Sequence, residues 1–171
     1  MTYGIAFGSN LGDRLENLRQ GLSELLSRSG GRLLAASKVY ETEPVACPEG
    51  SASYLNTVIE LEAIQSPHEL HHILQRVESL LGRPAQRDLN APRQLDLDIL
   101  YAGGLTINDE QLIIPHPRMQ MRRFVLQPLS DISPELVLPG QAENVRSLLE
   151  SLDDDPLSVS AIADARWAVL T

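Results

Sequence analysis

Residues 92–100 have the sequence Pro-Arg-Gln-Leu-Asp-Leu-Asp-Ile-Leu, in which apolar and acidic side chains alternate. This alternation predicts a β-strand with its leucines and isoleucine on a buried face and with Asp96 and Asp98 on the opposite face. The Cα atoms of the two acidic residues are then about 7 Å apart on a rigid backbone. Because two neighbouring carboxylates repel each other, a cation between them is favoured. Carboxylate oxygens suit Mg²⁺, and the nearby Arg93 indicates that the metal holds a phosphate.

A strand with one face in water shows the same alternation, so the basic residues around the pair decide between the two interpretations. Thirteen of the 14 basic residues are arginine, and six of these lie between residues 83 and 123. A general bias of the genome towards arginine is the alternative explanation for their number. Arginine, however, binds phosphate oxygens through a planar, bidentate fork that lysine lacks. The basic residues expected near the acidic pair are Arg83, Arg87, Arg93, His116, Arg118, Arg122 and Arg123.

Length and composition restrict the class of protein. A chain of 171 residues is large enough to fold as one domain without disulfides, and its single cysteine, Cys47, fits a reducing compartment such as the cytoplasm. No apolar run is long enough to span a membrane. The net charge of −9 argues against binding to nucleic acid. We therefore expect a cytoplasmic, monomeric protein that acts on small molecules.

The order of the predicted elements indicates an α+β fold. Helical spacing of apolar residues and capping patterns predict two main helices, and alternating or apolar runs predict four main strands. In the order strand, helix, strand, strand, helix, strand, they indicate a ferredoxin-like, four-stranded antiparallel sheet with both helices on one face. The predicted strands are 2–7, 32–40, 54–63 and 95–101, and the predicted helices are 13–28 and 66–81.

The segments outside this pattern are predicted with less detail. Long loops are expected at 41–53 and 83–92, a short hairpin at 106–114 and a short helix within 119–129. We divide the single domain into a core, residues 1–139, and an acidic extension, residues 140–171. The extension has no assigned role, and only its helix at 145–152 is predicted.

Two local motifs each have a simple structural explanation besides a functional one. Gly8-Ser9-Asn10-Leu11-Gly12 follows a strand and precedes a helix, as a phosphate-binding turn does, but it lacks the usual glycine spacing, which favours a plain tight turn. His68, His71 and His72 have the spacing of metal ligands on a helix. No cysteine or nearby carboxylate cluster completes a zinc site, so a solvated helix face is favoured.

The residues above carry a resemblance to the 6-hydroxymethyl-7,8-dihydropterin pyrophosphokinases of folate biosynthesis. Its most specific part is A-P-R-x-x-D-L-D-I-L at 91–100, supported by P-H-P-R-M at 115–119 and R-R-F-V-L-x-P-L at 122–129. The resemblance covers roughly residues 3–139. It implies a transferase that moves the β,γ-diphosphate of ATP to the pterin hydroxymethyl group and releases AMP.

The resemblance also implies roles for individual residues. Asp96 and Asp98 would hold two Mg²⁺ ions and, with Arg83 and Arg93, would form the catalytic group. The expected ATP-binding residues are Gln75, Glu78, Arg83, Arg93, Ile99, His116 and Arg122. The expected pterin-binding residues are Gly8, Thr42, Pro44, Val45, Tyr54, Asn56 and Phe124.

The chain departs from the family pattern at two loop positions. Ala85 stands where a second loop arginine is common, with Arg87 as its possible replacement, and Asn90 stands where an aromatic residue is common. These departures leave two other functions open. One is a family member that binds both substrates but turns over poorly, and the other is a ferredoxin-like module that binds a metabolite or a partner without chemistry.

Overall fold

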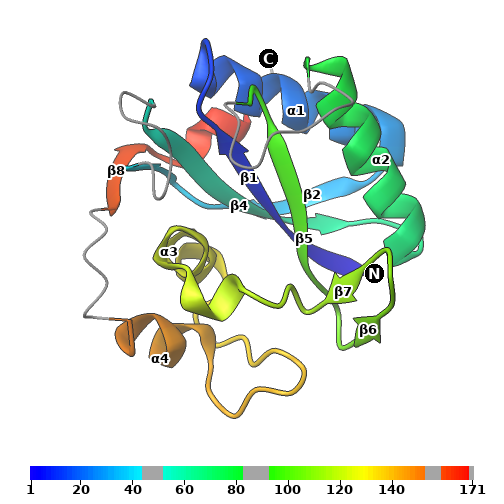
Figure 1. Cartoon of the computed structure of the whole chain (residues 1–171), viewed down its shortest axis with the longest axis vertical. Coiled ribbons are helices and arrows are strands. Elements are labelled where there is room, and N and C mark those ends of the chain that lie inside the picture. The colour runs from blue at the N-terminus through cyan, green and yellow to red at the C-terminus, as the bar shows by residue number, and fades with distance from the viewer. Residues whose placement is uncertain (44–51, 83–92, 153–158, 170–171) are drawn as a thin grey trace.

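The computed structural model describes residues 1–43, 52–82, 93–152 and 159–169, and it shows an antiparallel sheet between two layers of helices (Figure 1). The elements, in chain order, are β1 (Thr2–Ser9), α1 (Arg14–Ser29), β2 (Arg32–Ala36), β3 (Val39–Thr42), β4 (Tyr54–Glu62), α2 (Pro67–Leu80), β5 (Asp96–Ala102), β6 (Ile107–Asn108), β7 (Ile113–Ile114), η1 (Met119–Met121), α3 (Arg123–Ile132), α4 (Val145–Glu150), β8 (Val159–Ala163) and η2 (Ala165–Ala168).

The α+β class and the antiparallel pairing are confirmed, but the sheet has six strands instead of the predicted four. Its order is β5-β1-β4-β3-β8. β2 and β3 pair with the same edge of β4, β3 with its first residues and β2 with its last residues. One additional strand, β8, comes from C-terminal residues whose structure the sequence did not predict. The other arises because the predicted strand 32–40 is divided into β2 and β3.

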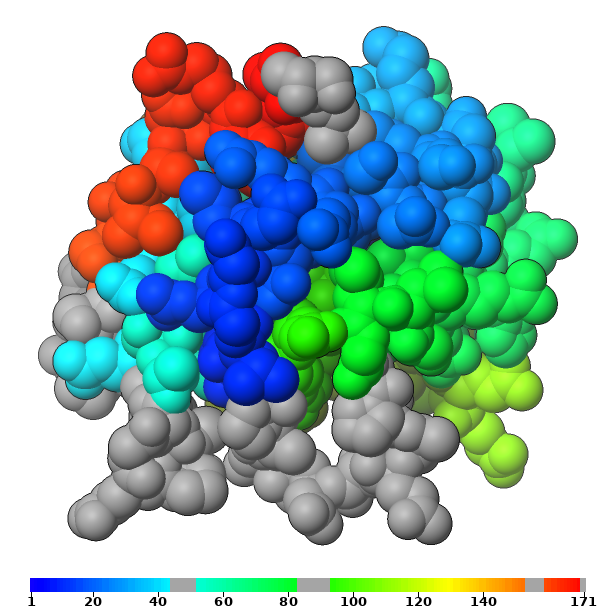
Figure 2. Space-filling view, turned by 90° about the horizontal axis from the view of Figure 1, so that it is seen from above, coloured from blue at the N-terminus to red at the C-terminus, as the bar shows by residue number. Residues whose placement is uncertain are grey.

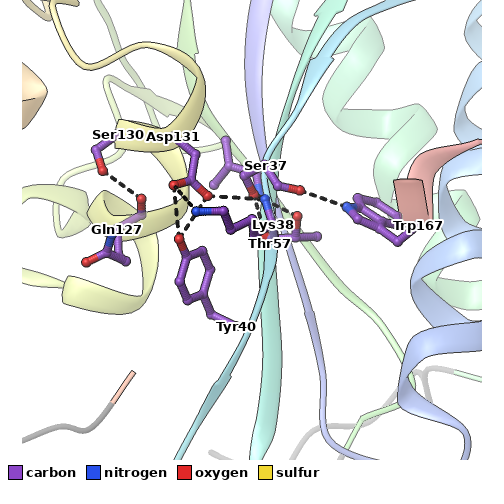
Figure 3. Close-up of polar contacts among 9 residues, drawn as sticks. Ser37, Lys38, Tyr40, Thr57, Gln127, Ser130, Asp131 and Trp167 are labelled. Carbon is purple, nitrogen blue, oxygen red and sulfur yellow. Dashed lines mark hydrogen bonds and ion pairs between the residues drawn. The ribbon is translucent and has the colours of Figure 1, made fainter. Parts of the chain in front are cut away.

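The division lies at Ser37 and Lys38, whose polar groups leave the regular strand pairing. Ser37 Oγ accepts the backbone N–H of Val58 at 3.0 Å, a bond that replaces a ladder hydrogen bond. Trp167 of η2 donates its indole N–H to the Ser37 carbonyl at 2.9 Å, and Asp131 of α3 accepts the Lys38 N–H at 3.2 Å (Figure 3). Ser37 and Lys38 therefore bind the C-terminal segment on one face of the sheet and α3 on the other.

Two apolar cores lie on opposite faces of the sheet. The first is formed with α1 and α2, and Ile5, Leu22 and Leu74 are fully buried in it. The second is formed with α3 and α4, and Val58 and Leu126 are fully buried there. The prediction of helices on one face is thus correct for α1 and α2 but omits α3 and α4, which cover the other face (Figure 1).

The two main helices begin at the capping residues that the sequence indicates. Asp13 accepts the backbone N–H of Glu16 at 3.1 Å, and Ser66 and Glu69 form a reciprocal capping box at the start of α2. Gly30, with a φ of 59°, ends α1 in the left-handed conformation that glycine adopts most readily. Within the described part of the chain, no helix is both long and apolar enough to cross a membrane.

The C-terminal segment packs on the first core beside α1. Figure 2 shows the segment in red next to the blue helix, and Arg19 Nε donates to the Trp167 carbonyl at 3.4 Å. The Trp167 side chain is 2% exposed and meets the Phe7 ring edge-on, with 6.2 Å between ring centroids. Trp167 of the predicted extension is therefore part of the packed interior.

Gly4 provides the space for a buried polar cluster that joins the sheet to the end of α3. The Tyr101 ring lies against Gly4, and the Tyr101 hydroxyl and Ser133 Oγ both donate to Glu60 Oε1 at 2.5 Å. Burial and the adjacent Glu60 raise the pKa of Tyr101 well above its ordinary value, so the hydroxyl keeps its proton.

We expect Gly4→Ala to lower the free energy of unfolding by about 1–3 kcal/mol, because overpacking of a filled core costs that much. A Cβ atom at this position would lie 2.1 Å from Tyr101 Cε1, a distance that requires the ring to move. Urea unfolding would measure the effect. Gly104→Ala is the matched control, since a Cβ there has nothing within 4 Å, and equal stability of the two variants would contradict the expectation.

Candidate active site

Asp96 and Asp98 lie on one face of β5, with the buried Leu97 pointing into the core of α1 and α2. Both acidic residues are partly exposed, whereas Leu97 is 4% exposed. Across the strand pair, Asp96 faces Gly8 and Asp98 faces Ala6. Neither neighbour on β1 has a large side chain that could cover the carboxylates.

Arg93 connects the preceding residues to the acidic pair. Its guanidinium Nη1 donates to Asp96 Oδ1 at 2.8 Å, and both side chains are about one-quarter to one-third exposed. Burial works to lower the pKa of Arg93, but the nearby Asp96, Tyr54 and Asp98 outweigh it and raise the pKa. A guanidinium fixed in this way still has further N–H groups to offer a phosphate.

Asn10 positions Arg93, a role that the sequence did not reveal. The backbone N–H of Arg93 donates to Asn10 Oδ1 at 2.8 Å, and the Asn10 N–H donates to the Arg93 carbonyl at 3.2 Å. The Asn10 side chain is 2% exposed. The turn at residues 8–12 was predicted as a plain tight turn, but it holds the arginine that pairs with Asp96. The only signal in the sequence was an asparagine after the first strand.

Glu78 of α2 fixes the backbone between the two acidic residues. Its carboxylate is 3% exposed and accepts the N–H of Leu97 at 2.9 Å. Among the described strands, β5 pairs with β1 and lies at the edge of the sheet, and Glu78 supplies the acceptor for this N–H on its outer side. The contact makes Glu78 a support for the Asp96–Asp98 strand, and its role on the nucleotide side stays a prediction.

His116 and Arg122 lie on the side of Asp98. The backbone N–H of His116 donates to the Leu100 carbonyl at 2.8 Å, which attaches the residue to β5. Burial lowers the pKa of His116, so its ring is neutral near pH 7. Because His116 Nδ1 accepts the Arg118 N–H at 3.2 Å, the ring proton is assigned to Nε2, where it can be donated.

Arg122 precedes α3 and carries a partly buried positive charge. Its guanidinium lies 5.4 Å from the centre of the Phe124 ring, and, among the described residues, it forms no ion pair. Burial and the adjacent Arg118 lower the pKa of Arg122, while Asp98 and Asp96 oppose this shift. A partly desolvated cation beside another cation favours an anionic ligand.

Four of the predicted pterin-side residues, Gly8, Thr42, Tyr54 and Asn56, lie on neighbouring strands, whereas Phe124 lies on α3. Gly8 is paired with Asp96 on one side and with Asn56 on the other. Asn56 Nδ2 donates to Thr42 Oγ1 at 2.8 Å, and both side chains are buried. A Cβ on Gly8 would lie 3.5 Å from Asn56 Oδ1 and 3.7 Å from Asp96 Cβ. Asp96, Gly8 and Asn56 thus form one row across β5, β1 and β4, with the Asp96 carboxylate at one end and the Asn56 amide at the other.

Two predicted ATP-side residues lie further from this row. Gln75 Nε2 is exposed on α2 and lies 3.0 Å from His71 Nε2. Ile99 is 3% exposed and its side chain belongs to the first core, on the face opposite the carboxylates. A contact of Ile99 with a nucleotide would therefore have to use its backbone.

Three predicted site residues, Arg83, Pro44 and Val45, lie outside the described residues. The same holds for Cys47 and for the departures at Ala85, Arg87 and Asn90. Their predicted roles are not tested.

The alternative zinc site on α2 receives no support from the described residues. His68 Nε2 lies 2.8 Å from Asp109 Oδ2, and His71 lies beside Gln75. In the described ranges, no three histidine, cysteine, aspartate or glutamate side chains are grouped to hold a metal. His68 and His71 contact polar neighbours on a partly exposed helix face.

We expect Asn10→Ala to reduce both stability and turnover. The variant loses the acceptor of the Arg93 N–H, and an unmade hydrogen bond of this kind costs about 1–3 kcal/mol. Loss of the contact also releases the guanidinium that pairs with Asp96. Urea unfolding and steady-state kinetics would measure the two effects. Asn108→Ala, at an exposed position of β6, is the control, and normal turnover of Asn10→Ala would contradict the role of Asn10.

Known proteins provide an independent comparison. Residues 4–134 match the family described as 7,8-dihydro-6-hydroxymethylpterin-pyrophosphokinase. The chain is 43% identical over 129 residues to 2-amino-4-hydroxy-6-hydroxymethyldihydropteridine pyrophosphokinase from Bacillus subtilis, an alignment that covers 75% of each chain. The enzyme of the same name from Haemophilus influenzae is 40% identical over 140 residues, covering 82% of this chain and 86% of that one.

Solved structures show the same fold at lower sequence identity. A Plasmodium falciparum HPPK-DHPS structure aligns with a TM-score of 0.71 and 15% identity, covering 88% of this chain. This chain spans 45% of that longer protein. The family match covers most of the chain, and the fold agrees with that of the solved structures. This chain is a member of the 7,8-dihydro-6-hydroxymethylpterin-pyrophosphokinase family.

Proposed function

We propose that this chain transfers the β,γ-diphosphate of ATP to the hydroxymethyl group of 6-hydroxymethyl-7,8-dihydropterin and releases AMP. The observation that carries the proposal is the row of Asp96, Gly8 and Asn56 across β5, β1 and β4. It puts a carboxylate suited to a metal-bound triphosphate beside an amide suited to a pterin ring edge. Family membership favours this function over a binding module without chemistry, because its relatives are named as pyrophosphokinases.

Magnesium is part of the proposal, and the donor set fits it. Asp96 and Asp98 are hard oxygen donors on one strand, and Mg²⁺ is usually bound by one or two carboxylates with waters and substrate phosphates. The same two residues would hold the two ions that the family resemblance implies. When bound there, Mg²⁺ would neutralise charge on the triphosphate. The backbone contact from Glu78 to Leu97 keeps both carboxylates in place.

In the proposed reaction, the pterin hydroxyl oxygen forms a bond to the β-phosphorus of ATP. The bond from this phosphorus to the oxygen bridging the α- and β-phosphates breaks, and that oxygen leaves with AMP. The hydroxyl proton passes to solvent. Arg93 and Arg122 would hold the phosphate oxygens as charge shifts between them, and neutral His116 would donate from Nε2. Positioning and electrostatic stabilisation therefore supply most of the rate.

The pterin would lie between aromatic side chains and the polar row. Tyr54 and Phe124 offer ring faces for stacking, while Asn56, fixed by Thr42, offers its amide oxygen to the ring N–H groups. Arg122 lies on the Phe124 ring, which connects the pterin side with the phosphate side. Pro44 and Val45 would complete the pocket, Arg83 would add a further phosphate contact, and Gln75 would contact the nucleotide.

The test is AMP formation from ATP, Mg²⁺ and 6-hydroxymethyl-7,8-dihydropterin, with product detected by chromatography. Formation of AMP only when pterin is present supports the proposal. Binding of both substrates without AMP would indicate a member that binds but turns over poorly, as the departures at Ala85 and Asn90 allow. Absence of both binding and AMP would favour the module without chemistry.

The proposal extends to the organisation of the chain. We assign β1, β4, β5 and the β2–β3 pair to a ferredoxin-like arrangement, in which β8 is an addition. Residues 140–171 belong to the same domain as residues 1–139, because β8 pairs with β3 and Trp167 lies in the first core. A monomeric, cytoplasmic enzyme without nucleic-acid partners completes the proposal.

A further inference from the structure

Arg14 connects three chain segments beside the candidate pterin site. Its Nη1 lies 2.8 Å from Glu41 Oε1 and 2.7 Å from both the carbonyl and the hydroxyl oxygen of Ser53. The Ser53 hydroxyl in turn donates to Glu41 Oε1 at 2.6 Å. These three residues, the Arg14 cluster, form a closed set of hydrogen bonds in which each member contacts the other two.

The cluster joins the two ends of the β3–β4 connection to the start of α1. Glu41 is the next-to-last residue of β3, and Ser53 immediately precedes β4. Figure 2 shows the blue N-terminal end of α1 next to the cyan segments that contain these two ends. α1 itself is fixed at this end by its Asp13 cap. The Arg14 cluster therefore holds the hairpin ends against a rigid helix.

The residues adjacent to the cluster are those proposed to bind pterin. Thr42 follows Glu41 and is paired with Tyr54, which follows Ser53. Thr42 also receives the hydrogen bond of the Asn56 amide. The separation and twist of β3 and β4 at this point consequently set the positions of the pocket residues. A change in the Arg14 cluster would be transmitted to them through one peptide unit.

The contacts of the cluster suit positioning more than overall stability. The side chains of Arg14 and Glu41 are 27% and 36% exposed, and partly exposed ion pairs contribute little to folding. The hydrogen bonds from Ser53 and Arg14 lower the pKa of Glu41, so the carboxylate remains charged at neutral pH. One guanidinium group that meets three oxygens from two segments fixes their relative geometry.

We propose that Arg14 is a positioning residue for the pterin substrate, acting through Glu41 and Ser53 on the Thr42–Tyr54 pair. This inference rests on the proposed function, since the pterin roles of Thr42 and Tyr54 belong to it. Arg14 acts only through other residues and touches no reacting group. The effect of its removal should therefore be confined to the pterin and should spare the ATP side, where Asp96, Asp98 and Arg122 lie on other elements.

The test compares Arg14→Ala with the unaltered protein in binding and in turnover. We expect the Kd for 6-hydroxymethylpterin, measured calorimetrically with Mg²⁺ and a non-hydrolysable ATP analogue, to rise about tenfold, which corresponds to about 1.4 kcal/mol. The KM for the dihydropterin should rise in parallel, while kcat and the KM for ATP change less than about twofold. Arg28→Ala, which breaks the exposed Arg28–Glu24 pair in the same helix, is the matched control.

The reversed pair Arg14→Glu with Glu41→Arg tests the contact itself. We expect it to recover part of the pterin affinity lost in Arg14→Ala. An unchanged pterin Kd in Arg14→Ala would overturn the inference. So would an equal loss for both substrates with a lower melting temperature, because that result indicates a general structural role.

Failure of the proposed function gives a different result. The unaltered protein would then bind pterin and ATP but form no AMP, and the Kd ratio would still decide the role of Arg14. If the unaltered protein bound no pterin, both the inference and the proposed function would be wrong.

Discussion

Asp98→Asn is expected to reduce AMP formation by a factor on the order of 10²–10⁴, because the variant loses one of the two anionic oxygen ligands proposed for Mg²⁺. The amide has nearly the same size as the carboxylate, and the residue across the strand pair, Ala6, has a small side chain. The fold should therefore be kept. Asp96→Asn should show a similar loss and should also weaken the ion pair with Arg93.

The measurement is AMP release over a range of Mg²⁺ concentrations. A variant with a damaged metal site should need more Mg²⁺ and should not regain full turnover at saturation. Glu62→Gln, which changes an exposed carboxylate at the end of β4, is the control and should behave like the unaltered protein. Near-normal turnover of Asp98→Asn at low Mg²⁺ would show that the metal assignment is wrong.

The sequence predicted the parts of the site that depend on local patterns. Alternation in β5 predicted that Asp96 and Asp98 share a face, and the capping residues predicted the starts of α1 and α2. Each of these features is decided by residues within a few positions of each other. For the same reason, the strand position of Asn56 was correct, whereas Gly8, predicted in the turn after the first strand, is part of β1. The pairing of Gly8 with Asn56 across β1 and β4 required the sheet register.

The features that the sequence did not reveal depend on contacts between distant segments. Asn10 and Arg93 are 83 positions apart, and their paired hydrogen bonds give the turn at 8–12 its role. Trp167 contacts Ser37 across 130 positions and helps to divide the predicted strand 32–40. Such contacts carry no periodic signal, because a single polar side chain supplies each one. Short helices were predicted within 119–129 and at 145–152, but not that α3 and α4 cover the second face of the sheet, because that placement also depends on contacts between distant segments.

The basic residues around the acidic pair come from separate elements of the fold. Asp96 has Arg93 as its partner, whereas Asp98 lies on the side of His116 and Arg122. A triphosphate held by both acidic residues through metal would thus meet a cation at each end. Arg93 is fixed by Asn10, and Arg122 by its place at the start of α3, so the two cations are preorganised by separate elements.

Arg122→Ala is expected to lower kcat/KM for ATP by about 10²-fold, because the variant removes a partly desolvated charge proposed to hold the phosphates. In the absence of ligand this guanidinium lies near Arg118, and burial together with that neighbour lowers its pKa. Its removal relieves repulsion, so the melting temperature should stay the same or rise. A loss of activity without a loss of stability is the result that a phosphate-binding role requires.

Two further variants separate the charge of Arg122 from its contact with the Phe124 ring. Arg122→Met keeps an apolar stem over the ring, which lies 5.4 Å from the guanidinium carbon, and should show the same loss for ATP with a nearly normal KM for pterin. Arg122→Lys keeps the charge but not the bidentate fork, so its turnover should be intermediate. Arg146→Ala, which removes an exposed arginine paired with Glu135, is the control. If Arg122→Met retained full kcat/KM for ATP, the positive charge at this position would have no part in phosphate binding, and Arg93 with His116 would have to supply it.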